Sequence, residues 1–266
     1  MHDLRILRRL VVIDLTGQLI YRWAFLIYML SMVVGPAVAL LVWRAAAANG
    51  AALPVTMEYL VSYFVLLGVV NMLVSSWLAF WLAEMIRLGK LSIWLVRPAS
   101  VLLDLVANNI SEKLVKAIFL LPLIGTLAFV FRADLRLPTE PTTWALFAVS
   151  VLMAAIITFA VDVVLGALAF WFDDIGGFFR LRLLAGTVLS GQLVPLAFFP
   201  EWLSGFIATQ PFRFMLSFPL ELLIGGLSGR DLALGFSLQF GYMILAVGGA
   251  MVVWRRGQRM YAAVGA

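Results

Sequence analysis

The stretch WAFLIYMLSMVVGPAVALLVW, from Trp23 to Trp43, runs for 21 residues without a charged side chain. A helix of that length is about 31 Å long at 1.5 Å per residue, which just exceeds the roughly 30 Å hydrocarbon core of a bilayer. The apolar part of a cleavable signal peptide is only about 7–15 residues long. The stretch therefore predicts a transmembrane helix that stays in the protein, with a kink at Pro36.

The rest of the chain repeats this pattern, since 64% of the residues are hydrophobic and 12% are charged, with a mean hydropathy of +1.06. Soluble domains contain about 25% charged residues. We predict an all-α membrane protein with six transmembrane helices, the first at 23–43 and the others at 59–82, 114–131, 144–172, 183–199 and 232–254. There is no cysteine, and the only histidine is His2, which argues against disulfides and against Cys- or His-based metal sites.

Basic residues indicate the orientation of these helices, because Lys and Arg are enriched in cytoplasmic loops. With both termini in the cytoplasm, all but five of the 19 Lys and Arg residues lie inside; the five outside are Arg44, Arg132, Arg136, Arg213 and Arg230. We predict three regions: an N-terminal amphipathic interfacial helix at 1–22, a transmembrane domain at 23–254 and a cytoplasmic tail at 255–266. The interfacial helix carries Arg5, Arg8 and Arg9.

An unusual apolar segment at 195–228 is interrupted repeatedly by proline and is rich in aromatic residues. No piece between its prolines is long enough to cross a bilayer. We predict an outer re-entrant or interfacial helical hairpin between helices five and six; the alternative is an ordinary seventh and eighth span. Its candidate residues are Pro200, Trp202, Pro211, Arg213 and Pro219.

The most basic loop, at 83–116, contains GKLSIWLVRP from Gly89 to Pro98. Gly89 is expected to end or bend one helix, and Pro98 to favour a break after a short amphipathic helix. We predict a cytoplasmic helical elbow, which is either a plain membrane-surface loop or a docking surface with Trp94 and Leu91 as anchors. Its candidate residues are Glu84, Arg87, Gly89, Lys90, Leu91, Trp94, Leu95, Arg97 and Pro98.

Motifs of catalysis are missing from the sequence, including the phosphate-binding G-x-x-x-x-G-K-[ST], H-E-x-x-H and G-x-S-x-G. We therefore predict a protein that is not itself an enzyme and has no cofactor. Asp162 is the one carboxylate deep inside a predicted span, which favours a structural or gating role over a proton relay. The glycine pairs 176–177, 225–226 and 248–249 are expected to allow close helix packing.

GKLSIWLVRP fits a G-x-L-x-x-x-L-x-R-P element, and a second stretch, FWFDDIGGFFRLRLL at 170–184, lies between helices four and five with Asp173, Asp174 and Arg180. With these stretches in this order, the chain resembles the single-domain permeases of ABC-2 type exporters. The closest resemblance is to the bacterial branch of daunorubicin-type and antibiotic-efflux permeases, and it covers essentially the whole chain.

The resemblance implies a bacterial inner-membrane permease that pairs with an identical or homologous permease on two copies of a cytoplasmic P-loop ATPase. ATP and Mg would then bind the ATPase, and the N-terminal helix and the elbow would receive its motion. It implies export of an amphipathic, lipid-linked or polymeric substrate; membrane lipids are partners and nucleic acid is not. The alternatives are an ion-coupled secondary transporter and a membrane scaffold without transport, and the sequence leaves open the substrate and the choice between homodimer and heterodimer.

Overall fold

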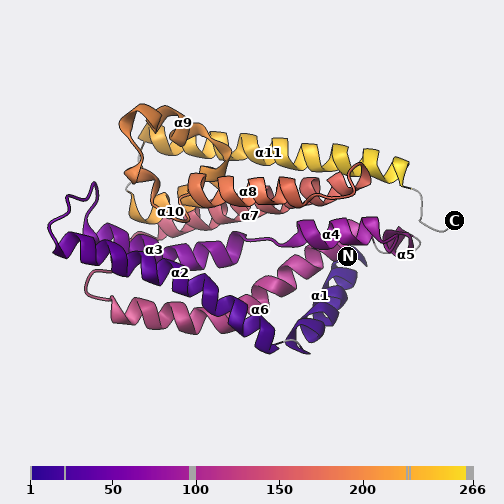
Figure 1. Ribbon diagram of the computed structural model, residues 1–266, viewed down its shortest axis with the longest axis horizontal. Helices are drawn as coiled ribbons and strands as arrows, with labels where there is room; N and C mark the ends of the chain where they lie inside the picture. The colour runs from indigo at the N-terminus through magenta and orange to yellow at the C-terminus, as the bar shows by residue number, and fades with distance from the viewer. Residues whose placement is uncertain (1, 21, 96–99, 226, 228, 262–266) are drawn as a thin grey trace.

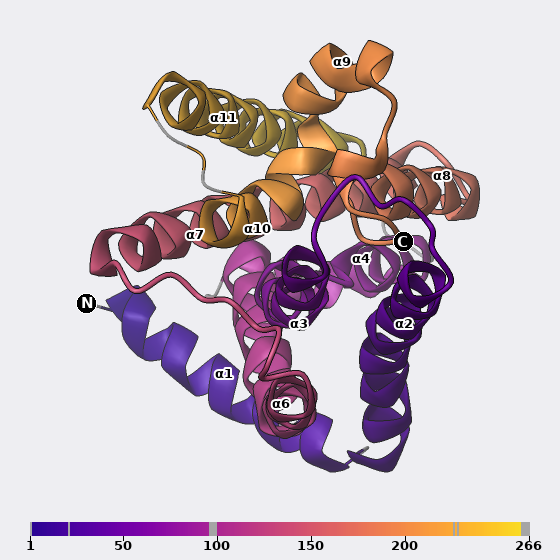
Figure 2. The ribbon, with the colours of Figure 1, turned by 90° about the vertical axis from the view of Figure 1, so that its left-hand side faces the viewer.

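The computed structural model describes residues 2–20, 22–95, 100–225, 227 and 229–261, and about 82% of these described residues are helical. The described residues contain no β-strand, so the predicted all-α class is confirmed. Most of the long helices run along one axis of an elongated bundle (Figure 1). The exception is α1 (His2–Ile20), which lies across α6 (Figure 2).

Among the described residues, four stretches are long and apolar enough to cross a membrane: Met57–Arg87, Val101–Val130, Pro141–Phe170 and Gly229–Met260. Each has 30 to 32 residues, which corresponds to about 45 Å of helix, enough to cross the hydrocarbon core with tilt. They contain α3 (Met57–Val74) with α4 (Leu78–Arg87), α6 (Val101–Val130), α7 (Pro141–Ala167) with η1 (Leu168–Phe170), and α11 (Gly229–Met260). The chain is therefore a multi-pass membrane protein.

The bundle has two distinct ends (Figure 1). The elbow end, on the right, contains α5 (Leu91–Leu95), the N-terminus of the chain and the last turns of α11. The opposite end contains the loops at 49–56 and 131–140 and the short helix α9 (Ser204–Thr209). The first of these loops follows α2 (Arg22–Ala48), whose described portion Val34–Ala48 is also apolar.

The helix expected at 59–82 is broken into α3 and α4, with Ser75, Ser76 and Trp77 between them in non-helical conformation. Ser75 is extended, with φ −61° and ψ 147°, and its backbone N–H still bonds the carbonyl of Asn71. A break at membrane depth is tolerated only where other groups satisfy the freed backbone. Here the amine of Lys113 performs that role for the Ser75 carbonyl, as described below, and hydropathy alone could not reveal it.

The stretch at 99–116, the last part of the predicted elbow, was expected to return as a second amphipathic helix into the third span. In the structure the residues from 101 to 116 form the first half of the continuous helix α6. No helix-breaking residue occurs between Val101 and Lys116, so the helix continues into the apolar run that follows.

The helix expected at 183–199 instead occupies Gly176–Leu189 as α8, with 14 residues. At about 21 Å it is shorter than a bilayer core. The chain turns at Gly191, which has φ 82°, and a Cβ there would lie 2.3 Å from the hydroxyls of Tyr63 and Ser217. It continues through η2 (Leu196–Phe198), η3 (Glu201–Leu203), α9, η4 (Pro211–Met215) and α10 (Ser217–Ile224).

Close packing in the bundle depends on glycines outside the predicted pairs. Gly248 and Gly249 have open space where a Cβ would be. At Gly166 a Cβ would lie 2.8 Å from Leu82 Cβ, at Gly235 it would lie 2.2 Å from the Phe218 ring, and at Gly257 it would lie 2.0 Å from the Phe170 ring. These three positions fix how α7 meets α4, how α11 meets α10, and how α11 meets η1.

Candidate functional site

The elbow begins where α4 ends at Arg87. Gly89 has φ 72°, a conformation that favours glycine, which confirms the expectation that it ends or bends the helix. The five residues of α5 follow, and Leu91 is 0% exposed within an apolar cluster that includes Leu82, Leu105 and Trp254. The elbow is therefore packed against α4, α6 and α11.

Burial changes the docking surface that the sequence suggested. Leu91 faces the core of its own chain and is not available as an anchor for a partner. Trp94 is partly buried, with its ring 6.5 Å from that of Trp81. The exposed side of the elbow instead carries Ile93, which is 56% exposed, and Lys90, which lies 3.9 Å from Glu84. Arg97 and Pro98 lie outside the described residues.

The loop before α8 joins the elbow at the same end. Arg87 Nη1 donates a hydrogen bond to the backbone carbonyl of Asp173 at 3.1 Å. Asp174 accepts a hydrogen bond from the backbone N–H of Gly176, the first residue of α8, at 2.7 Å. A cavity of about 340 Å³ between α4 and this loop is lined by Glu84, Arg87, Asp173 and Asp174. Arg180 is exposed on α8 and does not line it.

The N-terminal helix presents its arginines to the outside. Arg5, Arg8 and Arg9 are all exposed on α1. On its other side α1 packs on α6, where the Ser111 hydroxyl donates to the carbonyl of Val11 at 3.0 Å. The three arginines thus form an exposed basic face, on a helix that packs on α6.

Asp162 lies on α7 beside the break between α3 and α4, and it is 0% exposed. Its Oδ1 lies 3.0 Å from Arg182 Nη2 on α8. The carboxylate also faces the Ser76 hydroxyl and the backbone N–H of Leu78, the first residue of α4. Helix N-termini favour negative charge, so α4 begins where a buried carboxylate stabilises it. A paired acid of this kind supports a structural role.

Two lysines of α6 satisfy the other side of the break. Lys113 Nζ donates to the backbone carbonyl of Ser75 at 3.0 Å and to Asn109 Oδ1. Lys116 is 0% exposed; its Nζ donates to the Ser75 hydroxyl at 2.9 Å and pairs with Glu112. We call these groups the break cluster: Ser75, Ser76, Glu112, Lys113, Lys116, Asp162 and Arg182.

Sequence reasoning missed most of the break cluster. It counted Lys113, Lys116 and Arg182 only as markers of the cytoplasmic side. A usable signal was the four-residue spacing of Asn109 to Lys113 and of Glu112 to Lys116, which brings side chains together on a helix. Nothing in the sequence pairs Asp162 with Arg182, which lies 20 residues farther along the chain.

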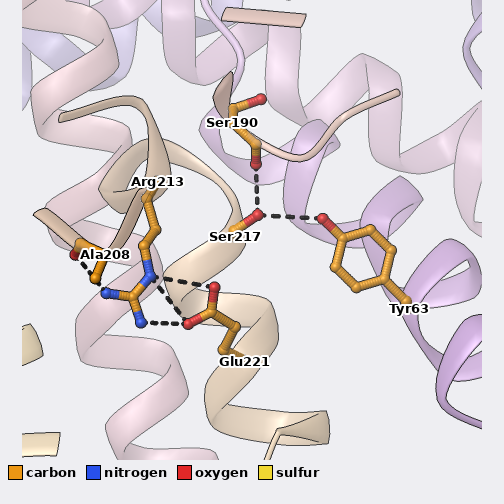
Figure 3. Close-up of polar contacts among 6 residues, drawn as sticks. All are labelled: Tyr63, Ser190, Ala208, Arg213, Ser217 and Glu221. Atoms are coloured by element: carbon orange, nitrogen blue, oxygen red, sulfur yellow. Dashed lines mark hydrogen bonds and ion pairs between the residues drawn. The ribbon is translucent and has the colours of Figure 1, made fainter. Parts of the chain in front are cut away.

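The segment at 195–228, which the sequence predicts to be on the outer side, is held to the bundle by polar contacts (Figure 3). The Tyr63 hydroxyl of α3 donates to the carbonyl of Gly191 at 2.8 Å and lies 3.1 Å from the Ser217 hydroxyl, which in turn donates to the carbonyl of Ser190. Arg213 pairs with Glu221 and donates to the carbonyl of Ala208.

The predicted outer residues separate into two groups. Pro219 is buried in α10, whereas Pro200, Trp202 and Pro211 are exposed, Trp202 to 81%. The segment therefore has one buried arm, which is α10, and one exposed arm, which contains Pro200, Trp202 and Pro211.

The family of the chain follows from a comparison with known families. The family model for the ABC-2 family transporter protein matches residues 49–265, from the loop after α2 into the C-terminal tail. The chain belongs to the ABC-2 transporter family. This ABC-2 protein has the long apolar helices of a membrane permease, and the elbow and the break cluster both lie inside the matched region. No curated protein matches the chain.

Membership in the ABC-2 family also fits what the site can do chemically. Within the described residues no group of three or more His, Asp or Glu side chains is arranged to hold a metal ion. The polar groups of the break cluster bond backbone atoms or each other. Their arrangement supports a helix break, which suits a membrane component of a transporter.

Proposed function

We propose that the chain is the permease subunit of an ABC-2 exporter in a bacterial inner membrane. Two permeases, identical or homologous, form the path, and two copies of a cytoplasmic P-loop ATPase bind ATP and Mg and drive them. The family match supports the transporter assignment. The observation that carries the coupling role is the elbow, whose Leu91 is buried in an apolar cluster with residues of α4, α6 and α11, at the end of the bundle where α11 ends.

We propose six crossings, with the elbow end in the cytoplasm. The exposed basic residues at the elbow end support this orientation under the positive-inside rule: Arg5, Arg8, Arg9, Arg87, Lys90, Arg180, Arg255, Arg256 and Arg259. The crossings are α2, α3 with α4, α6, α7, α8 and α11, followed by a cytoplasmic tail from 255.

The region at 195–228 is proposed as an outer re-entrant segment. Its buried arm, α10, packs on α3 and α7, and Gln210 donates to the carbonyl of Leu189 at the end of α8. Such contacts allow a helix as short as α8 to serve as a crossing, because the descending arm meets it inside the bundle.

The proposed mechanism passes force from the elbow to α4. Closure of the ATPase dimer would push on the exposed side of α5, and Leu91 and Trp94 would transmit that push to α4. Since α4 contacts α7 closely at Gly166 and is separated from α3 by a break, it can tilt as a unit while α3 stays in the core. Discrete packed elements of this kind move as rigid bodies. Asp162 would act in this step as a gating group.

The test begins with affinity purification of the full chain from native membranes. We expect a P-loop ATPase to co-purify, and its absence under conditions that retain the permease would refute the proposal. With the complex in hand, Trp94→Ala and Arg97→Ala should leave assembly intact and uncouple ATP hydrolysis from export. Arg132→Ala, an exposed arginine at the opposite end, is the matched control and should behave as the wild type. Wild-type coupling in both elbow variants would rule out the coupling role.

A further inference from the structure

A cavity of about 130 Å³ lies beside the break between α3 and α4. Its wall is formed by Ser75 and Ser76 at the break, Thr158 of α7, Arg182 and Leu183 of α8, and Phe212 of η4. A water molecule in the liquid occupies about 30 Å³, so the cavity has room for a group larger than one water. It lies between two segments that the proposed mechanism moves relative to each other.

Two polar side chains of the wall have hydrogen-bonding capacity that the chain does not use. Thr158 is 6% exposed, and its hydroxyl has no hydrogen-bond partner among the described residues. A buried hydroxyl without a partner is costly, which points to a group that binds it from the cavity. Arg182 reaches Asp162 with one Nη atom and also lines the cavity. A guanidinium has five N–H donors, so an acceptor in the cavity can bind the donors that Asp162 leaves free and can compete with Asp162 for the others.

The charge around the cavity favours an anion. The break cluster contains three cations, Lys113, Lys116 and Arg182, and two acids, Glu112 and Asp162. Lys116 pairs with Glu112 and Arg182 with Asp162, whereas the bonds of Lys113 go to neutral oxygens. An unbalanced positive charge in an environment of low dielectric attracts a negative group strongly.

The side of the cavity that faces away from the bundle is apolar. Trp77 and Leu183 line it and are 44% and 43% exposed. On a chain that spans a membrane, such exposed apolar side chains contact lipid tails. The wall is thus polar and cationic toward the break and apolar toward the bilayer.

We propose that this cavity binds the anionic head group of a membrane amphiphile, with its acyl chain lying along Leu183 and Trp77. Arg182 and Thr158 bind the head group, and Asp162 competes with it for the guanidinium. The relevance of this site to export rests on the proposed function. Lipid binding can be measured without the ATPase. The lipid site can therefore be disproved while the transporter assignment stands, and the transporter assignment can be disproved while the lipid site stands.

Phosphatidylglycerol is the probe, with phosphatidylcholine of the same acyl chains as the zwitterionic control. The purified full-length protein in mild detergent is titrated with each lipid, and the bound lipid is counted by native mass spectrometry. We expect phosphatidylglycerol to bind at least ten-fold more tightly. Arg182→Gln should abolish this preference, whereas Arg180→Gln, an exposed arginine two residues away, should keep it.

Asp162→Asn separates a binding role from a structural one. If Asp162 competes for Arg182, the variant should bind phosphatidylglycerol several-fold more tightly, whereas a purely structural ion pair predicts weaker binding or none. Should Arg182→Gln alone fail to fold, the double variant Asp162→Asn/Arg182→Gln keeps a neutral pair and should lack the preference. An unchanged preference in Arg182→Gln or in the double variant, or weaker binding in Asp162→Asn, would overturn the proposal. Inorganic phosphate that displaces the lipid at equal concentration would overturn the assignment to an amphiphile.

Discussion

Gly166 lies where α4 crosses α7. Replacing it with alanine should displace α4, the helix that tilts in the proposed mechanism. The added Cβ would lie 2.8 Å from Leu82 Cβ and 2.9 Å from the backbone oxygen of Ala79. Neither atom is the end of a flexible side chain, and Leu82 is 0% exposed. Relief therefore requires a displacement of α4 itself, and overpacking of this kind costs about 1–3 kcal/mol.

The opposing effect is the better helix propensity of alanine, at most about 1 kcal/mol over glycine in a helix interior. Gly166 is next to the last residue of α7, so its gain is smaller. We expect Gly166→Ala to lower the free energy of unfolding by about 1–2 kcal/mol. Gly248→Ala, in the middle of α11 with open space around the new methyl, should raise it by up to about 1 kcal/mol.

The assay is unfolding of the purified protein in mild detergent by increasing SDS, followed by circular dichroism, with the two variants and the wild type side by side. ATPase coupling is measured in the same preparations once the partner is in hand. Gly166→Ala should lose stability and coupling together, because the shift of α4 displaces its first turn from Asp162. A Gly166→Ala protein as stable and as well coupled as Gly248→Ala would refute the close contact between α4 and α7.

Two further predictions concern the outer segment and the orientation. Tyr63→Phe should lower the free energy of unfolding by about 1–3 kcal/mol, because it leaves buried acceptors unpaired without opening a cavity. Ser217→Ala should lower it by a similar amount. In a double-mutant cycle measured by SDS unfolding, the two losses should be less than additive, since two hydroxyl hydrogens serve three contacts. Fully additive losses would contradict the shared network. Because the chain has no cysteine, Lys90→Cys and Trp202→Cys can each be labelled alone with a membrane-impermeant maleimide. Trp202→Cys should react in intact cells, and Lys90→Cys should react only in inside-out vesicles. The reverse pattern would contradict the proposed topology.

Much of the fold was predictable because hydrophobic length is a local property. The apolar run at 232–254 lies within α11, those at 114–131 and 144–172 extend only one or two residues past α6 and η1, and Gly89 does end α4. The extents of other elements were not predictable. The break at Ser75 follows a run as apolar as its neighbours, and α8 ends at Leu189 in the middle of an apolar stretch. Both depend on groups far along the chain.

Some residues of the candidate site could likewise be predicted from the sequence, and others could not. The sequence singled out Asp162 and the elbow, since an acid in a span and a bounded basic loop are visible without a structure. It could not pair Asp162 with Arg182, and it took Leu91 for an exposed anchor although its side chain is 0% exposed. Burial depends on which helices surround a residue, and that information is not local.

The sequence by itself determined that this chain is helical, crosses a membrane several times and resembles a permease, because those properties follow from composition, the length of apolar runs and short motifs. Only the tertiary structure decided where a membrane helix is allowed to break. A free backbone carbonyl in the bilayer needs a partner, and the amines of Lys113 and Lys116 reach Ser75 from a helix about 40 positions away. The same folding places Arg182 between the buried Asp162 and the cavity beside the break.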